Sequence, residues 1–228
     1  MKRIISVDGN KGGTGKSVTT TALLDTALEN EKSVLFIEAD DSHADVAKSY
    51  ANTVETVPLK LNSGNGFIEL IDVVHNSTAD IIIINNGAQS KIWNEKCGGE
   101  SFVKNLHRLD ATMSVIWVAD TVIESVELCA DFFEKYKEIQ EVKMYFCINE
   151  HNGAINEFSI WFNSNIRKKI LESGGGEIVL CDSASRMMNA MKNQHLRWDQ
   201  LEELEICNRF EAERFRQEFN EVFKPFVI

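Results

Sequence analysis

Residues Asp8 to Ser17, DGNKGGTGKS, combine glycines, lysines and a hydroxyl group at a spacing that suits phosphate binding. Glycines let backbone N–H groups converge on an anion and let that anion approach closely. Lys16 supplies a charge for the terminal phosphates, and the Ser17 hydroxyl can bind Mg²⁺. The common pattern G-x-x-x-x-G-K-[ST] fails at its first glycine, where Asn10 stands, but K-G-G-x-G-K-S remains. The stretch therefore predicts a loop that binds a nucleoside triphosphate, and Lys11 is one lysine more than this task requires.

A phosphate loop must leave a strand and open a helix, whose N-terminus adds positive potential. Apolar runs rich in β-branched residues alternate with amphipathic stretches along the chain. The predicted strands are Arg3–Val7, Ser33–Ala39, Asp80–Ile84, Met113–Val118, Lys143–Ile148 and Glu177–Leu180. The predicted helices include Ser17–Glu29, Gly66–Val74, Ser101–Leu109, Ile123–Tyr136 and Asn156–Leu171. This alternation predicts an α/β fold with a mostly parallel central sheet flanked by helices on both faces. The region Ser49–Asn65 is expected to be a surface excursion.

The segment Lys11–Ser17 resembles the deviant Walker A loop of the ParA/MinD superfamily of ATPases. The resemblance implies ATP and Mg²⁺ as cofactors, bound by Gly12, Gly13, Thr14, Gly15, Lys16, Ser17 and Val18. It also implies that Lys11 is the signature lysine, which in this family reaches across a dimer interface to the ATP of the other subunit. A second cation is reasonable there, because a desolvated γ-phosphate between two subunits needs charge compensation. A homodimer with ATP, and a protein partner that reads the dimer state, follow from the resemblance.

The second predicted strand ends in Glu38-Ala39-Asp40, where the family has two acids one residue apart. The resemblance gives Asp40 the role of positioning or activating the attacking water, for which a carboxylate is suited, so Asp40 joins Lys11 and Lys16 as a predicted catalytic residue. Glu38 replaces the first acid and is expected to support the Mg²⁺ shell, together with Ser17 and Asp40. The usual Pro-Gln after the second acid is replaced by Asp41-Ser42, so this loop departs from the family pattern.

The third predicted strand ends in Ile84-Asn85-Asn86-Gly87-Ala88, and Asn85 stands where a Walker B acid is expected. Asn85 can offer an amide oxygen but no charge, so metal binding or turnover should be weaker. Asn85→Asp is then expected to raise turnover. This strand ending resembles the TraL- and StbB-type proteins of conjugative plasmids, which are thought to act in plasmid transfer or stability.

Asn149 ends the strand Phe146-Cys147-Ile148, at the place where the family often reads the adenine edge with an asparagine. An amide can donate to and accept from the base. Asparagine is equally ordinary at the end of a strand, so both interpretations stay open.

The composition favours one domain, residues 1–228, without a signal peptide or membrane span, and hence a cytoplasmic protein. The formal net charge of −11 disfavours non-specific DNA binding, and the densest basic run, Arg167-Lys168-Lys169, fits a solvated helix face better. Five cysteines without a C-x-x-C pair indicate reduced thiols. In the iron-protein branch of the superfamily, cysteines from two subunits hold an iron–sulfur cluster, so Cys97 and Cys129 are candidates for such a site. Cys97 lies in a polar stretch and Cys129 inside a predicted amphipathic helix, which disfavours a cluster.

A C-terminal helix is predicted over about 207–224, ended by Pro225 and with Phe215, Phe219, Val222 and Phe226 on one stripe. MinD-like relatives use such a helix as a membrane anchor. Here acids are mixed with bases on the polar side, which favours packing against the domain or against a partner.

The function expected from these features is a slow ATPase that switches by ATP-dependent dimerisation, in plasmid partition, positioning or conjugative transfer. Two alternatives remain open from the sequence. One is a nucleotide-binding regulatory module with little hydrolysis, which Asn85 suggests. The other is a small-molecule ligase or kinase that uses its phosphate loop within one chain, and Lys11 argues against it.

Overall fold

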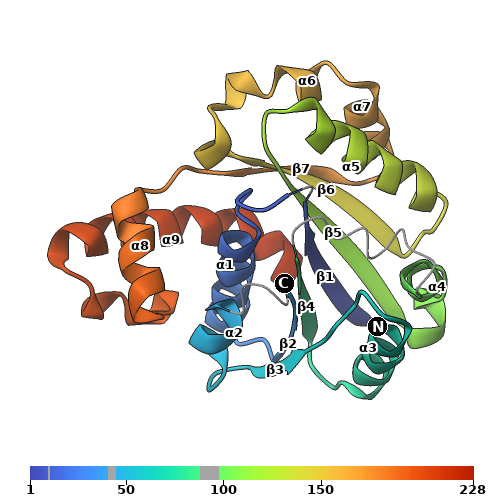
Figure 1. The fold of residues 1–228 in the computed structure, drawn as a ribbon, viewed down its shortest axis with the longest axis horizontal. Coiled ribbons are helices and arrows are strands. Elements are labelled where there is room, and N and C mark those ends of the chain that lie inside the picture. The colour runs from blue at the N-terminus through green and yellow to red at the C-terminus, as the bar shows by residue number, and fades with distance from the viewer. Residues whose placement is uncertain (10, 41–44, 88–97) are drawn as a thin grey trace.

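The structure is a computed structural model that describes residues 1–9, 11–40, 45–87 and 98–228 (Figure 1). At its centre lies a parallel sheet of seven strands in the order β3-β2-β4-β1-β5-β6-β7. The strands are β1 (Lys2–Asp8), β2 (Val34–Ala39), β3 (Glu55–Pro58), β4 (Ile81–Asn86), β5 (Ala111–Ala119), β6 (Val142–Asn149) and β7 (Gly176–Leu180). The predicted α/β class and the mostly parallel sheet are confirmed.

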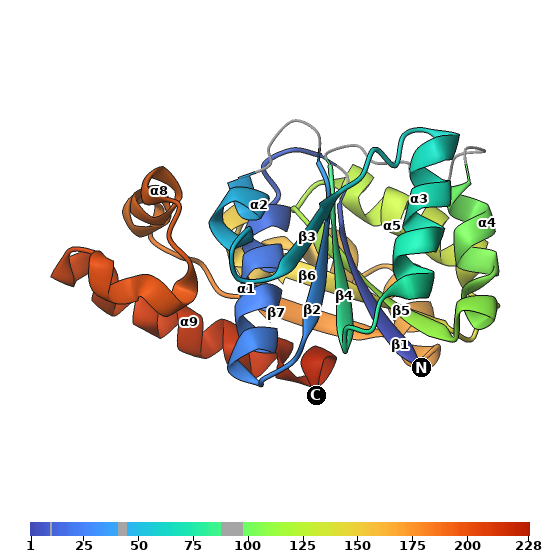
Figure 2. The same cartoon turned by 90° about the horizontal axis from the view of Figure 1, so that it is seen from below.

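Helices cover both faces of this sheet (Figures 1 and 2). On one face lie α1 (Lys16–Glu29), α2 (Asp45–Tyr50) and α9 (Ile206–Val227). The helix α8 (Ser185–Gln194) packs on α9, and the 3-10 helix η5 (Trp198–Glu203) packs on α1 and α9, so both extend this layer beyond the sheet (Figure 2). The other face packs against α3 (Gly64–Asn76), α4 (Gly99–Lys104), α5 (Ile123–Tyr136), α6 (Ser159–Phe162) and α7 (Asn165–Glu172). Parallel strands need both faces covered, and the fully buried run Ile81–Ile84 in β4 satisfies this condition.

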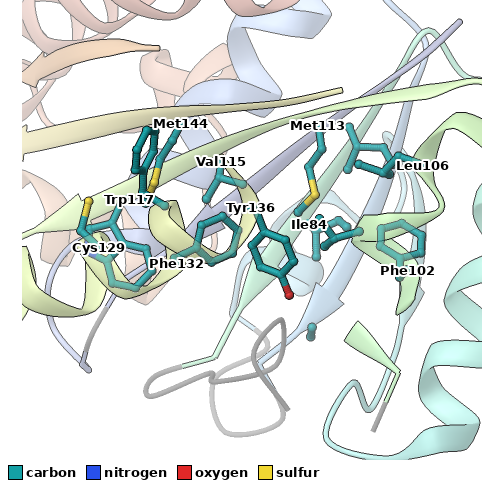
Figure 3. Close-up of a cluster of buried hydrophobic side chains, with 14 of the residues drawn as sticks. Ile84, Phe102, Leu106, Met113, Val115, Trp117, Cys129, Phe132, Tyr136 and Met144 are labelled. Carbon is teal, nitrogen blue, oxygen red and sulfur yellow. The ribbon is translucent and has the colours of Figure 1, made fainter. Parts of the chain in front are cut away.

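The core beneath α4 and α5 is drawn in Figure 3. Side chains from β5, such as Val115 and Trp117, contact the aromatic face of α5, where the rings of Phe132 and Tyr136 lie 4.9 Å apart. The Trp117 indole is held because its Nε1–H donates to the backbone carbonyl of Ser125 at 3.0 Å. This contact fixes the first turn of α5 against the end of β5, a place that becomes important at the phosphate loop.

Several element boundaries differ from the sequence predictions. The region Ser49–Asn65 contains β3, an edge strand with only partly buried side chains, so its apolar signal is too weak to detect. The predicted helix Ser101–Leu109 is divided into α4 and the 3-10 helix η2 (Leu106–Leu109). The predicted helix Asn156–Leu171 is divided in the same way, into the 3-10 helix η4 (Ile155–Glu157), α6 and α7.

The C-terminal helix α9 packs against α1 through its apolar stripe, as predicted for packing against the domain. The fully buried members of the stripe are Ala212, Phe215, Phe219, Phe223 and Val227, while Val222 and Phe226 are only partly buried. Pro225 does not end the helix, because it lies in the last turn and the Ile228 N–H still donates to the Lys224 carbonyl at 3.1 Å. No helix in the described part of the chain is long and apolar enough to cross a membrane.

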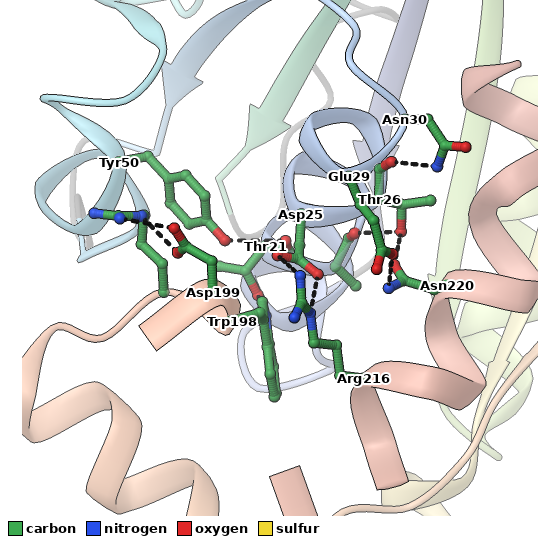
Figure 4. A network of polar contacts seen from close by, with 12 residues as sticks. Thr21, Asp25, Thr26, Glu29, Asn30, Tyr50, Trp198, Asp199, Arg216 and Asn220 are labelled. Carbon is green, nitrogen blue, oxygen red and sulfur yellow. Dashed lines mark hydrogen bonds and ion pairs between the residues drawn. The ribbon is translucent and has the colours of Figure 1, made fainter. Parts of the chain in front are cut away.

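Polar contacts also tie α1 to the C-terminal elements (Figure 4). The Arg216 guanidinium on α9 binds the buried Asp25 carboxylate on α1 with two hydrogen bonds of 2.7 and 3.1 Å. The Trp198 indole of η5 donates to the Thr21 hydroxyl at 3.2 Å. These contacts anchor α1 on the side that faces away from the sheet. The N-terminus of the same helix adjoins the phosphate loop.

Candidate functional site

The loop between β1 and α1 has the geometry of an anion cradle. β1 ends at Asp8 and α1 begins at Lys16, so the N-terminus of α1 faces the loop. Gly13 and Gly15 have φ values of 82° and 103°, a conformation that residues with a Cβ rarely adopt. A Cβ at Gly15 would also lie 2.2 Å from Asn149 Nδ2. Asn10 lies outside the described residues.

Lys16 lies inside this cradle and is 6% exposed. Its ammonium donates to the Lys11 carbonyl oxygen at 2.8 Å. Burial lowers the pKa of Lys16, while the carboxylates of Asp8 and Asp40 oppose that shift. A buried cation supported by nearby acids is well placed to bind a phosphate, because the phosphate would stabilise the charge that burial penalises.

Lys11 projects outward on the rim of the loop, with a side chain that is 48% exposed. Its Nζ lies 2.6 Å from Oδ2 of Asp120, just after β5. The other oxygen, Oδ1, accepts from the Ser125 hydroxyl at 2.5 Å and from the Val122 N–H at 3.3 Å. The Asp120 carboxylate raises the pKa of Lys11. The sequence analysis missed Asp120, although an acid at the carboxyl end of an apolar strand was a usable signal.

Glu38 and Asn85 occupy the ends of neighbouring strands and share one polar cluster. Asn85 Nδ2 donates to Glu38 Oε1 at 2.8 Å, and Asn85 Oδ1 accepts from the Thr20 hydroxyl of α1 at 3.0 Å. The Asp40 N–H also donates to Glu38 Oε1, at 3.2 Å. Glu38 Oε2 is buried and has no hydrogen-bond partner among the described residues. An unpartnered carboxylate oxygen beside the loop fits a role toward Mg²⁺ or its bound water.

Burial raises the pKa of Glu38 from 4.5 to about 7, against the hydrogen bonds from Asn85 and Asp40, which lower it. The folded protein therefore binds this proton more tightly than the unfolded chain does. We expect the stabilisation to be complete below about pH 4.5 and to be lost as the pH rises through about 7, by up to about 3 kcal/mol. Urea unfolding between pH 4.5 and 8 measures this. Glu38→Gln should flatten the profile, and an unchanged slope in that variant would contradict the assignment.

Asp40 lies at the end of β2, partly exposed beside Gly87. It lines the cavity beside the loop, and its charge opposes the lowering of the Lys16 pKa. Its role toward the attacking water stays a prediction. Asp41 and Ser42 lie outside the described residues.

Asn149 supports the loop from the other side. Its Nδ2 donates to the Thr14 carbonyl at 2.7 Å, and Asn152, in the 3-10 helix η3 (Glu150–Asn152), donates to the same oxygen at 2.9 Å. Asn152 also binds the Ala119 carbonyl at 3.1 Å, so it joins the loop to β5. Asn149 thus has a structural contact in addition to its predicted contact with adenine, which stays a prediction. Asn152 is a second residue that the sequence analysis missed.

A cavity of about 570 Å³ adjoins the loop. The predicted residues that line it are Gly12, Gly13, Gly15, Lys16, Ser17, Val18, Asp40 and Asn149. Lys11, Thr14 and Glu38 are not among its lining residues. The cavity continues past Val18 to apolar side chains that include Met188 and Trp198. It therefore offers a polar end for phosphates and Mg²⁺ and an apolar end for a base.

The cysteines and other metal-binding residue types form no cluster in the described ranges, where no group of three His, Cys, Asp or Glu could hold a metal ion. Cys129 is fully buried in the core, and burial raises the pKa of its thiol. Cys97 lies outside the described residues.

Comparisons with known proteins agree with this geometry. No family model matches the chain. The chain is 30% identical over 227 residues to protein MobD from Acidithiobacillus ferrooxidans, covering 99% of this chain and 98% of that protein. Its fold is similar to MinD from Pyrococcus horikoshii, solved with Mg-ADP, with a TM-score of 0.60 and 13% identity over 100% of this chain and 95% of that one. It is also similar to a Borrelia burgdorferi protein assigned to plasmid partition and bound to AMPPNP, with a TM-score of 0.62 and 15% identity over 99% of each chain.

Proposed function

The chain belongs to the ParA/MinD superfamily of P-loop ATPases, and from this premise we propose that it binds Mg·ATP, dimerises around it and hydrolyses it slowly. The observation that carries the proposal is the loop itself, in which a buried Lys16 and an outward Lys11 stand on one anion cradle. Two lysines with such different exposure suit two different phosphate groups, one bound within the chain and one in a second copy.

Each proposed role follows from the position of the residue. Lys16 and the loop N–H groups would hold the phosphates, and Ser17 at the start of α1 would bind Mg²⁺. Asp40 would position the attacking water, because it faces the same end of the cavity. Val18 and Asn149 would line the path toward the base.

We further propose that the switch serves plasmid mobilisation or positioning in the cytoplasm. Support comes from the relative MobD, which is similar along nearly the whole chain, and from the plasmid partition protein among the similar folds. A partner protein would read the dimer, and the net charge of −11 makes a basic surface on that partner the better complement.

The dimer is tested by light scattering of the 25.8 kDa chain with Mg·ATP and then with Mg·ADP. We expect a mass near that of the monomer with ADP and near twice that mass with ATP. Lys11→Ala should stay monomeric with ATP and still bind a fluorescent ATP analogue, because Lys16, buried in the loop of the same chain, would still hold the phosphates. Lys60→Ala, at an exposed lysine that is not among the residues lining the cavity, is the matched control. A mass that ignores the nucleotide would refute the proposed switch.

Asn85 favours a second candidate function, a nucleotide-binding regulatory module with little hydrolysis. The Asn85 amide carries no charge and is already bound to Thr20 and Glu38. Phosphate release over hours separates the two functions, since a module of this kind would dimerise with ATP and release almost no phosphate.

A further inference from the structure

The ends of β2 and β4 carry an unusual pair of residues. The two strands are parallel neighbours, and Glu38 lies directly opposite Asn85 in their register. Both side chains are buried, with Glu38 4% and Asn85 1% exposed. One strand end thus presents a carboxylate, and the adjacent end presents an amide in hydrogen-bond contact with it.

The hydrogen bonds give the two side chains different tasks. Asn85 has its donor on Glu38 Oε1 and its acceptor on the Thr20 hydroxyl, so both ends of the amide hold a neighbour. Glu38 Oε1 accepts from two donors, whereas the buried Oε2 makes no hydrogen bond of good geometry to a described residue. The Ala47 N–H in the first turn of α2 lies near enough to lower the pKa of this carboxyl, but it leaves Oε2 able to accept from a further donor. A water of a Mg²⁺ shell would be such a donor.

We propose that Glu38 supplies the carboxylate that the end of β4 lacks, and that Asn85 is the positioning residue that holds it toward the metal shell. This inference rests on the proposed binding of Mg·ATP. An aspartate at 85 could not replace the amide, because it has no N–H for Glu38 Oε1 and would place a second negative charge at 2.8 Å in a buried site. In the nucleotide-free chain, with no metal ion to compensate a second charge, the buried contact between these two side chains therefore favours a single carboxylate.

The proposal reverses the simple expectation for Asn85→Asp. That variant alone should harm the site, although it restores the acid that the strand end lacks. Adding Glu38→Gln should repair it in part, because the amide that this second substitution introduces can donate to the new carboxylate, and the total charge returns to that of the native pair. The repair is incomplete because the Asp40 N–H, which donates to the same Oε1 in the native protein, loses its acceptor. In the double variant the amide lies on β2 and the carboxylate on β4, the reverse of the native arrangement.

The first test is the melting temperature of the nucleotide-free protein at pH 8, for the native chain, the two single variants and the double variant. Asn85→Asp should lower it by about 5 °C, and the double variant should recover about half of that loss. Asn86→Asp is the matched control, because Asn86 is equally buried but donates to Ser6 rather than to Glu38. Adding Glu38→Gln to Asn86→Asp should not raise the melting temperature of that control variant. The proposed pairing of Glu38 with Asn85 is overturned if Glu38→Gln rescues both aspartate variants equally, or if Asn85→Asp has no effect.

The second test is the gain in affinity that Mg²⁺ gives a fluorescent ATP analogue, titrated with and without the metal. Glu38→Gln should lose about 10-fold of that gain, and the double variant should recover it. A native metal dependence in Glu38→Gln overturns the role of Glu38. If the native chain binds no nucleotide at all, the proposed function fails, and the melting temperatures still decide whether the two residues are paired.

Discussion

Lys16→Ala should lower the affinity for ATP by about 100-fold, because charge-assisted hydrogen bonds to phosphate are among the strongest that a side chain makes. The buried position of Lys16 strengthens this expectation. Its ammonium has little contact with water, so a bound phosphate would supply the stabilisation that solvent cannot. Titration with a fluorescent ATP analogue measures the loss.

A separate readout guards against a simple loss of folding. Removing the ammonium relieves the cost of its burial but also takes a positive charge from the carboxylates of Asp8 and Asp40. These effects oppose each other, so the nucleotide-free variant should melt within about 5 °C of the native protein. Lys60→Ala should keep native affinity. Native affinity in Lys16→Ala would show that this loop is not the phosphate site.

Arg216→Ala should lower the free energy of unfolding by about 3 kcal/mol. The Asp25 carboxylate is 4% exposed, and Arg216 is its two-bonded partner across the contact of α1 and α9 (Figure 4). Removing Arg216 leaves a buried acid without its cation, in a place where burial already raises the pKa of Asp25. Thermal unfolding should show a melting temperature lower by about 6–12 °C.

The control for this variant is an exposed pair on neighbouring elements. Arg186 of α8 and Glu205 lie 3.0 Å apart, with side chains 71% and 74% exposed. Solvent screens such a pair, so Arg186→Ala should change stability by less than about 1 kcal/mol. Equal losses in Arg186→Ala and Arg216→Ala would mean that burial does not decide the effect.

The fold followed from local pattern because its strongest signals were local. The run Ile81–Ile84 could only be a strand covered on both faces, and Ile123–Tyr136 shows its helical periodicity without interruption. Strand β3 escaped detection because an edge strand with partly exposed residues carries little hydrophobic contrast. The continuation of α9 past Pro225 also escaped, since proline costs less near a helix end than in the middle.

The loop residues of the candidate site could be named from the sequence, whereas their partners could not. Glycine and lysine spacing is a property of one short segment, and the structure keeps that segment together at the end of β1. Asp120 and Asn152 reach the same site from other segments, and Thr20, one turn into α1, binds Asn85 from β4. Their contacts depend on the order of the strands in the sheet, which cannot be read from the local pattern of a single sequence.

The ion pair of Lys11 with Asp120 bears on how such a protein tells a triphosphate from a diphosphate. In the single chain Lys11 is already paired with the Asp120 carboxylate, which Ser125 and Val122 hold in place. A nucleotide bound to a second copy would have to bind Lys11 more strongly than the single Asp120 carboxylate does. A γ-phosphate, with more charge and more acceptor oxygens, would win that competition, and ADP has no such group to offer. ATP and ADP would then be distinguished by whether the γ-phosphate displaces Asp120 from Lys11. This exchange of partners would need no prior conformational change in either subunit.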